Sequence, residues 1–371
     1  MEQTRADKQQ FTHVALASCE DELGLSFDDV TVIFACSEGF VSYLSVALQS
    51  IIDNASDDRH YDFVVLTRDL SPESMITLTH QVTRDNMGIG FLDVEAALGG
   101  RKLPHYGHFK PETYFRLLAP SLLPSVEKAI YLDSDLVALD DVAKLYDIDV
   151  SGHLLGATRD ADTVGQVCGY DEGVGYYLAH DLGMSNPLDY FQAGVLLMNL
   201  EEFRRQTTPD QLLQIATMRT WRWLDQDVLN RVVDGNYVRI DMRWNLLYDW
   251  QGIRREKIIG SAPADYRQEY EAARQNPGIV HYAGADDRPW LYPLVDYGDR
   301  FWKYARRSPY IGTLRRGLER SLVTPGGLGQ RARNNLKYKV GLNAFDVAFP
   351  PRTTRRKLTI GAYMRMGGSI G

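Results

Sequence analysis

The sequence predicts an α/β protein with a mainly parallel sheet and helices on both faces of that sheet. Short apolar, β-prone runs alternate with segments of helical periodicity in the first hundred residues, an order that places consecutive strands parallel to one another. A further strand, expected at residues 129–132, stops at two carboxylates, Asp133 and Asp135. Ligands of open α/β sheets bind in the crevice at the carboxyl ends of the strands, so we expect a site there.

Three strands and two helices are predicted before that strand. Apolar residues share one face of a helix expected at residues 41–52, and a second helix is expected from Pro72, because proline suits the first turn. The polar segment 1–29 is expected to form an N-terminal arm. The three strands are expected at residues 30–35, 63–66 and 89–92.

Strands and helices alternate in the rest of the chain as well, with one exception. Residues 165–186 are rich in Gly, Asp and Tyr, and we expect a loop there that acts as a lid or contacts substrate. The elements expected elsewhere are a helix at 111–118 that carries Arg116, strands at 154–158 and 191–200, helices near 201–206 and 221–230, and a strand that ends at His281.

Asp133 and Asp135 are candidate metal ligands. Residues two apart in extended chain share a face, and two hard oxygen donors suit a divalent cation that also holds phosphate. His281 would add an imidazole, a combination suited to manganese, with magnesium as the alternative ion. Gly284 would let backbone approach a diphosphate closely, and Arg288 would donate charge-assisted hydrogen bonds to it.

The Asp-x-Asp spacing is not specific by itself. It recurs at Asp160 and Asp162, and again at Asp225 and Asp227. A solvated strand end accounts for such a pair without a ligand, and a carboxylate in the first turn of a helix accounts for it as a cap. The apolar strand immediately before Asp133 favours the metal interpretation at that position.

Composition and motifs exclude several classes of protein. A chain of 371 residues with 44% hydrophobic residues suits one large α/β domain or two smaller ones. No G-x-G-x-x-G follows the first strand, which disfavours a dinucleotide-binding domain. Three distant cysteines fit a reducing compartment better than a disulfide framework or a zinc site. We find no signal-peptide pattern and no apolar run of the roughly 20 residues that span a bilayer, and we expect a cytoplasmic protein.

The C-terminal segment, residues 301–371, differs from the rest of the chain in charge. It carries 15 Lys and Arg residues against two acids, whereas the remainder carries 26 basic and 47 acidic residues. Tyr310, Leu314 and Leu318 are four apart and interleave with arginines, which is typical of a basic amphipathic helix. We expect this tail to contact an anionic membrane at its cytoplasmic face, with packing on the acidic body as the alternative. The acidic body would repel nucleic acid, so we expect no nucleic-acid partner.

Six motifs, taken together and in order, resemble glycosyltransferase family 8, the retaining sugar-nucleotide enzymes of GT-A fold. The resemblance covers about residues 30–295, and the implied organisation is an arm at 1–29, a GT-A catalytic domain at 30–300 and the basic tail at 301–371. The motifs are the strand and helix over 32–51, Thr-Tyr-Phe-Arg-Leu at 113–117, Tyr-Leu-Asp-Ser-Asp at 131–135, Phe-Gln-Ala-Gly-Val-Leu-Leu-Met-Asn-Leu at 191–200, Asp-Gln-Asp-Val-Leu-Asn at 225–230, and His-Tyr-Ala-Gly at 281–284 with Arg-Pro-Trp at 288–290.

The resemblance implies a role for each matching residue. The residues that match the manganese ligands holding the diphosphate of a UDP-sugar are Asp133, Asp135 and His281. The residues that match other positions around the nucleotide are Ala35, Ser37 and Phe40 at uridine, Ser134 between the ligands, and Gly284 and Arg288 at the diphosphate. The residues that match positions around the donor sugar are Arg116, Asp160, Gln192, Asp225 and Gln226.

The chain departs from the family pattern in three places. The family often has an acidic residue and an Asn at the uridine turn, where this chain has Ser37 and Gly39 next to Glu38, so the hydrogen bonds offered to uracil differ. Gln192 replaces the usual Asn that contacts a sugar hydroxyl, and its longer side chain would reshape the sugar pocket. Arg288 replaces a Lys, and arginine still suits phosphate.

The resemblance implies metal-dependent transfer of a hexose, glucose or galactose, from a UDP-sugar to a glycan or lipid-linked glycan, with retention at the anomeric carbon. A double displacement would need a carboxylate nucleophile facing the sugar. The matched position is Gln226, an amide, and Asp225 or Asp160 could replace it only if one of them faces the sugar. We therefore expect front-face attack, in which the leaving phosphate helps to deprotonate the acceptor.

Two other functions stay open from the sequence. A phosphatase of haloacid-dehalogenase type would use Asp133 as its nucleophile, but its strand normally begins the domain, and here about 130 residues precede it. A catalytically inactive sugar-nucleotide binder or scaffold would explain the departures at Ser37, Gly39 and Gln192.

Overall fold

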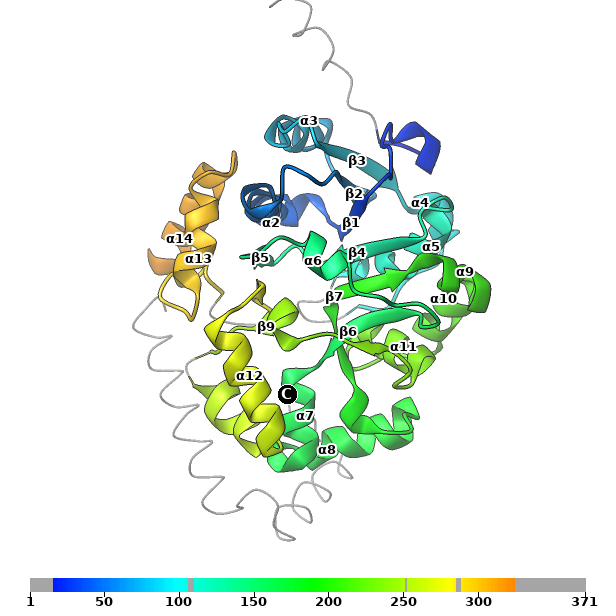
Figure 1. Cartoon of the computed structure of the whole chain (residues 1–371), viewed down its shortest axis with the longest axis vertical. Helices are drawn as coiled ribbons and strands as arrows, with labels where there is room; N and C mark the ends of the chain where they lie inside the picture. The colour runs from blue at the N-terminus through cyan, green and yellow to red at the C-terminus, as the bar shows by residue number, and fades with distance from the viewer. Residues whose placement is uncertain (1–15, 106–109, 251, 285–287, 324–371) are drawn as a thin grey trace, which may run out of the picture.

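A seven-stranded, mostly parallel sheet forms the centre of the protein (Figure 1). The computed structural model describes residues 16–105, 110–250, 252–284 and 288–323. Adjacent strands of this sheet are parallel except on the two sides of β7, which runs against both of its neighbours. The strands, in their order across the sheet, are β3 (Met87–Asp93), β2 (Tyr61–Thr67), β1 (Val30–Ala35), β4 (Lys128–Leu132), β7 (Phe191–Asn199), β6 (Leu155–Arg159) and β8 (Val238–Arg239). The predicted α/β class and mainly parallel sheet are confirmed.

Helices cover both faces of this sheet, as predicted (Figure 1). Leu44, Leu48 and Ile51 of α2 share one helical face and are buried with Val32 and Phe34 of β1, which is why this segment packs on the sheet. The helices on this face are α2 (Val41–Asn54), α3 (Pro72–Gln81) and α6 (Ala143–Tyr146). Those on the opposite face are α4 (Glu95–Leu98), α5 (Ala119–Leu122), α9 (Leu200–Gln206), α10 (Pro209–Met218) and α11 (Leu224–Val233).

A second, three-stranded sheet lies beside the first and was not predicted. Its order is β5 (Leu136–Ala138), β10 (Ile279–His281) and β9 (Leu246–Leu247). The central strand β10 is antiparallel to β5 and parallel to β9. Because β5 directly follows the two aspartates, this pairing brings a segment from late in the chain to the end of β4.

The loop predicted for residues 165–186 is wrong, because most of this segment is helical. Val174, Leu178 and Leu182 are four residues apart and fully buried, and this periodicity was obscured by the surrounding Gly and Asp residues. The turns of helix are α7 (Ala161–Gly165), η4 (Gln166–Tyr170), α8 (Glu172–Tyr176) and η5 (Tyr177–Leu182). The helix expected at 111–118 is present as a 3-10 helix, η3 (Pro111–Leu117).

Two helices near the C-terminus, α13 (Gly298–Ala305) and α14 (Ile311–Val323), pack beside α2 (Figure 1). Phe301, Tyr304 and Leu314 are buried against the body, which accounts for the apolar residues spaced along this part of the predicted tail. The rest of the tail, 324–371, and residues 1–15 of the arm lie outside the described residues. Among the described helices, none has the length and apolar character needed to cross a bilayer.

Two further elements complete the part of the chain around the second sheet. Helix α12 (Ala264–Gln275) buries Tyr266 and Tyr270 in the same apolar cluster as α13. The π-helix η8 (Ile253–Ile258) begins after Gly252, whose φ of +81° lies in the left-handed region that favours glycine. These elements form the wall of the protein next to β9 and β10.

Candidate active site

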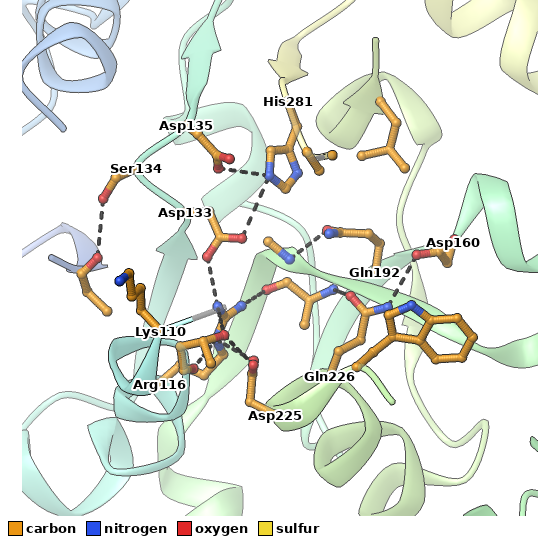
Figure 2. Close-up of a pocket in the computed structure, with 18 of the residues that line it drawn as sticks. Lys110, Arg116, Asp133, Ser134, Asp135, Asp160, Gln192, Asp225, Gln226 and His281 are labelled. Carbon is orange, nitrogen blue, oxygen red and sulfur yellow. Dashed lines mark hydrogen bonds and ion pairs between the residues drawn. The ribbon is translucent and has the colours of Figure 1, made fainter. Parts of the chain in front are cut away.

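All fourteen residues that the sequence indicated line one cleft with a volume of about 490 Å³. Figure 2 shows the part of this cleft around Asp133, Arg116 and Gln226. The strands β1, β4 and β6 are mutually parallel, so their carboxyl ends meet at one edge of the sheet, and the antiparallel β7 begins at that edge. The residues are Ala35, Ser37, Phe40, Arg116, Asp133, Ser134, Asp135, Asp160, Gln192, Asp225, Gln226, His281, Gly284 and Arg288.

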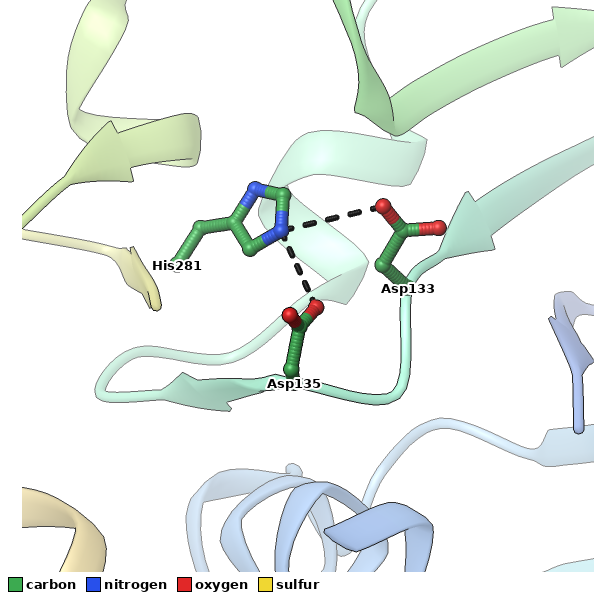
Figure 3. A group of neighbouring side chains, drawn as sticks. All are labelled: Asp133, Asp135 and His281. Carbon is green, nitrogen blue, oxygen red and sulfur yellow. Dashed lines mark hydrogen bonds and ion pairs between the residues drawn. The ribbon is translucent and has the colours of Figure 1, made fainter. Parts of the chain in front are cut away.

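Asp133, Asp135 and His281 form a compact cluster in this cleft (Figure 3). His281 Nε2 lies 3.1 Å from Asp135 Oδ1 and 3.7 Å from Asp133 Oδ2. The sheet register explains the cluster: His281 pairs with Leu136 across β10 and β5, and the N–H of Asp133 donates to the Gly194 carbonyl, at 2.8 Å, beyond the end of β4. Residues 146 positions apart in sequence thus meet at one point.

The cluster fits a divalent cation. One ligand atom from each of the three residues lies within 4.8 Å of the other two, and two carboxylates with an imidazole form a donor set suited to manganese. Gly194 provides the space in which these side chains pack together, because a Cβ at that position would overlap His281 Cε1 and lie 2.7 Å from Asp133 Oδ2.

Arg116 links the cluster of Asp133, Asp135 and His281 to another wall of the cleft. We expect that wall to contact the donor sugar. Its Nη2 donates to Asp133 Oδ1 at 2.8 Å, and its Nε lies 2.9 Å from Asp225 Oδ2. The guanidinium also donates to the Ala193 carbonyl and covers the Tyr131 ring, with Cζ 4.2 Å from the ring centroid. Because Arg116 is only 3% exposed, this network orders both carboxylates in advance.

Asp160, Asp225 and Gln226 form that wall. The Gln226 amide accepts from the Ala193 N–H at 2.9 Å and donates to Asp160 Oδ2 at 3.3 Å. Burial raises the pKa of Asp160 to about 6, and the charge of Asp162 acts in the same direction. Burial also raises the pKa of Asp225 to about 6, against the opposing effect of Arg116. Both carboxyls therefore change protonation close to neutral pH.

Asp227, from the same motif, has a structural role instead. Its carboxylate accepts from the Tyr177 and Tyr190 hydroxyls at 2.6 and 2.7 Å and from the Trp223 N–H at 2.9 Å. It is fully buried and does not line the cleft. The cap interpretation left open for this Asp-x-Asp pair therefore holds for Asp227.

The turn after β1 forms the end of the cleft assigned to the nucleotide. Ser37 and Phe40 line it, and Ser134 Oγ donates to the Ala35 carbonyl at 3.2 Å. Glu38 points elsewhere, because its carboxylate accepts from the backbone N–H of Ser71 at 2.9 Å and from the hydroxyl of Ser74 at 2.7 Å. Glu38 is thus engaged in holding the turn to α3 and does not replace the acid missing from position 37.

Gly284 and Arg288 line the cleft beside Asp135. Gly284 has φ of +144°, a backbone conformation that favours glycine. Arg288 Nε donates to the Gly284 carbonyl at 2.7 Å, and its Nη1 lies 3.6 Å from Asp135 Oδ2. The positively charged guanidinium of Arg288 therefore lies next to the cluster of Asp133, Asp135 and His281. Asp286 and Asp287, which precede Arg288 in the sequence, lie outside the described residues.

Two residues near the cleft, Arg254 and Asn245, had no signal in the sequence. Arg254, 3% exposed, pairs with both carboxylate oxygens of Asp162 at 2.7 and 2.9 Å and lines the cleft with it. Asn245 is buried between His281 and Gln192, and hydrogen-bonds to both side chains. Each contact joins segments more than 30 residues apart, so no local pattern could have shown it.

Comparison with known proteins decides the family. The family model described as glycosyl transferase family 8 matches residues 31–293. The chain belongs to glycosyltransferase family 8. It is a glycosyltransferase of GT-A fold, and this membership excludes the phosphatase alternative.

Named relatives of this family 8 chain are distant. General stress protein A of Bacillus subtilis is 24% identical, with 75% of this chain and 93% of the relative aligned. Glycosyltransferase GlyF of Streptococcus pneumoniae is 24% identical over 74% of this chain and 61% of its own length. The lipopolysaccharide 1,2-glucosyltransferase of Escherichia coli is 24% identical, over 50% of this chain and 54% of the relative.

Solved structures show the same fold. The bifunctional glycosyltransferase WbbM aligns with a TM-score of 0.70 and 26% identity over 80% of this chain and 53% of the WbbM chain. The galactosyltransferase LgtC, solved with donor and acceptor sugar analogues, aligns with a TM-score of 0.60 and 23% identity over 76% of this chain and 99% of its own. This family 8 chain thus spans about half of WbbM and almost all of LgtC.

Proposed function

We propose that this family 8 enzyme transfers a hexose, glucose or galactose, from a UDP-sugar to a glycan or lipid-linked glycan, with retention at the anomeric carbon. The observation that carries the proposal is the cluster of Asp133, Asp135 and His281 inside a cleft that also holds Arg288. Two similar proteins, a lipopolysaccharide glucosyltransferase and a galactosyltransferase, support the two hexoses named.

The cluster would hold Mn²⁺, or Mg²⁺ in its place, against the diphosphate of the donor. A cation bound there acts as a Lewis acid that neutralises charge on the leaving group. The Arg288 guanidinium would add charge-assisted hydrogen bonds to the same phosphates. Gly284, which the backbone conformation at this position favours, has no side chain to keep the phosphates away. Phe40 would stack on uracil, and Ser37 lines the same end of the cleft.

The sugar-facing wall favours front-face attack. Asp225 Oδ1 accepts from the Thr113 hydroxyl, and Oδ2 forms an ion pair with Arg116 but accepts no hydrogen bond. The two oxygens of Asp160 accept from the Thr163 N–H and from Gln226. Attack by Asp160 would break these bonds, the buried ion pair with Arg116 opposes attack by Asp225, and an amide at 226 is a poor nucleophile. A covalent glycosyl-enzyme trapped on Asp225 or Asp160 would contradict this mechanism.

The test is UDP release from a panel of UDP-sugars, with manganese and with EDTA, by the wild type and by Asp135→Asn. We expect release that requires manganese, and a loss of about 100-fold or more in the variant, because the cation stabilises the leaving group by several kcal/mol. The exposed Asp149→Asn is the matched control and should retain full activity. Manganese-dependent UDP binding without transfer, even with membrane glycans added, would instead support the inactive binder.

We further propose that the basic tail brings the enzyme to anionic membranes of the cytoplasmic face. The apolar face of α14 packs on the body through Leu314, whereas Arg315 and Arg316 are exposed. Residues 324–371 add nine Lys and Arg residues against one acid. Attraction at such a surface is electrostatic, worth about 1 kcal/mol for each basic residue near it.

Flotation with liposomes tests this attachment. The full chain is expected to float with phosphatidylglycerol liposomes at low salt, and a variant lacking residues 324–371 should float several-fold less, because basic charge is lost. The truncation keeps α13 and α14, since both pack on the body. Neutral phosphatidylcholine liposomes are the control. Equal recovery of the two proteins with anionic liposomes would refute a role for the tail.

A further inference from the structure

We propose that Gln192 and Asn245 form a hydrogen-bond relay that fixes the tautomer of His281, and that both are positioning residues for the metal cluster. The proposal rests on the proposed function only for the presence of a cation, because the hydrogen bonds of the relay are formed by the protein itself. The relay starts at a backbone N–H, passes through two side-chain amides, and ends at the imidazole. Its direction follows from the donors and acceptors that each group possesses.

The backbone N–H of Gly194 sets the direction. It can only donate, and its partner at 2.6 Å is Gln192 Oε1. That oxygen also receives the Asn245 side chain at 2.6 Å, so the atom of Asn245 that faces it must be the Nδ2 donor. With its nitrogen committed to Gln192, Asn245 turns its oxygen toward His281. The backbone N–H of Gly194, which can only donate, therefore determines the orientation of both side-chain amides.

The imidazole is the end of the relay. Asn245 Oδ1 lies 3.0 Å from His281 Nδ1, and an oxygen can only accept, so Nδ1 must carry the proton. Nε2 faces Asp133 and Asp135, at 3.7 and 3.1 Å. Because a carboxylate can only accept, Nε2 also donates a proton when no cation is present, and a bound cation would take the place of that proton while the proton on Nδ1 stays. The ring with its proton on Nδ1 is the tautomer that binds a metal through Nε2. The opposite tautomer would place two acceptors, Nδ1 and Asn245 Oδ1, face to face in a buried site.

Burial of the relay strengthens its preference for one histidine tautomer. His281 is 1% exposed and Asn245 is 2% exposed, so water does not compete for the bonds that join them. Gln192 is the position at which the chain departs from the usual Asn, and the longer side chain carries its oxygen to Asn245 while still reaching the Gly194 N–H. The substitution of Gln for Asn thus has a structural consequence for the metal cluster.

The first measurement is the histidine tautomer, by ¹⁵N NMR of the full chain loaded with Mg²⁺, a diamagnetic ion, near neutral pH. The chain has eight histidines, and the His281 signal is the one lost in His281→Gln. We expect the Nδ1–H tautomer in the wild type. We expect a mixture of tautomers in Asn245→Leu and in Gln192→Met. Gln192→Glu should retain Nδ1–H, because a carboxylate oxygen accepts the same two bonds. An Nε2–H tautomer in the wild type would overturn the proposal.

The second measurement is manganese affinity without sugar nucleotide, from the electron paramagnetic resonance signal of free Mn²⁺. We expect Asn245→Leu to weaken binding by about 10–100-fold, the usual effect of losing such a partner, although all three ligands are retained. Asn199→Ala, which removes the side chain that caps α9, is the control and should bind like the wild type. Should Asn245→Leu not fold, Gln192→Met decides the question.

Wild-type tautomer and affinity in the relay variants would refute the relay while leaving the proposed donor chemistry intact. Conversely, a correct tautomer in a protein that releases no UDP would refute the donor chemistry and leave the relay standing.

Discussion

Gly194→Ala is expected to abolish manganese binding and to lower manganese-dependent UDP release by about 10³-fold, the equivalent of several kcal/mol of lost transition-state stabilisation. The added Cβ would overlap the His281 ring and lie 2.7 Å from Asp133 Oδ2. Neither group can retreat cheaply, because His281 is held by Asn245, and Asp133 is held by Arg116. Manganese titration and UDP release measure the two effects.

Gly175→Ala is the matched control for this prediction. Its new Cβ would lie 3.7 Å from the nearest atom, which is an ordinary contact, and Gly175 is in the helix α8. We expect unchanged manganese affinity, and a small gain in stability because alanine is the better helix former. Wild-type manganese affinity in Gly194→Ala would show that the cluster tolerates displacement, and would contradict the close packing proposed here.

Arg116→Ala is expected to lower the free energy of unfolding by about 3–5 kcal/mol, the usual result of removing one partner of a buried ion pair. The variant would leave Asp225, whose side chain is 4% exposed, without its cation, and would release Asp133 from one of its partners. The packing of the guanidinium on Tyr131 is lost as well. Chemical denaturation in the absence of metal measures the change.

A surface pair provides the comparison for Arg116. Arg307 contacts Asp53 with 63% of its side chain exposed, so Arg307→Ala should cost less than about 1 kcal/mol. A similarly small cost for Arg116→Ala would mean that the two aspartates need no buried cation. That result would contradict the view of Arg116 as the group that orders both carboxylates.

Strands and candidate site residues were largely predictable from the sequence, because both depend on short segments. An apolar β-prone run such as β4 encodes its own burial, and the carboxyl ends of parallel strands must meet at one edge of the sheet. Asp133 at the end of β4 and Asp160 after β6 were therefore expected in the same region, and both line the cleft. Helix α2 was predictable for the same reason, since its apolar spacing repeats within 14 residues.

The prediction for residues 165–186 was wrong because the composition of this segment indicates a loop, whereas the spacing of its apolar residues indicates a helix. Residues 165–186 contain many Gly and Asp residues, which favour turns, yet the buried Val174, Leu178 and Leu182 make the segment helical. Burial against the rest of the protein outweighs the weak local preference for a loop. Only the tertiary structure provides the surface on which those three side chains are buried.

The hydrogen-bond and ion-pair partners of the site residues could be known only from the tertiary structure. Gln192, Asn245 and His281 come from three separate strands or turns, and Arg116 meets Asp225 across more than 100 residues of sequence. The identity of a side chain determines which contacts are possible, and the packing of β5, β7 and β10 determines which of them form. The sequence could thus indicate a site for a cation and a phosphate, while the tertiary structure decided the protonation state and orientation of the groups that would hold them.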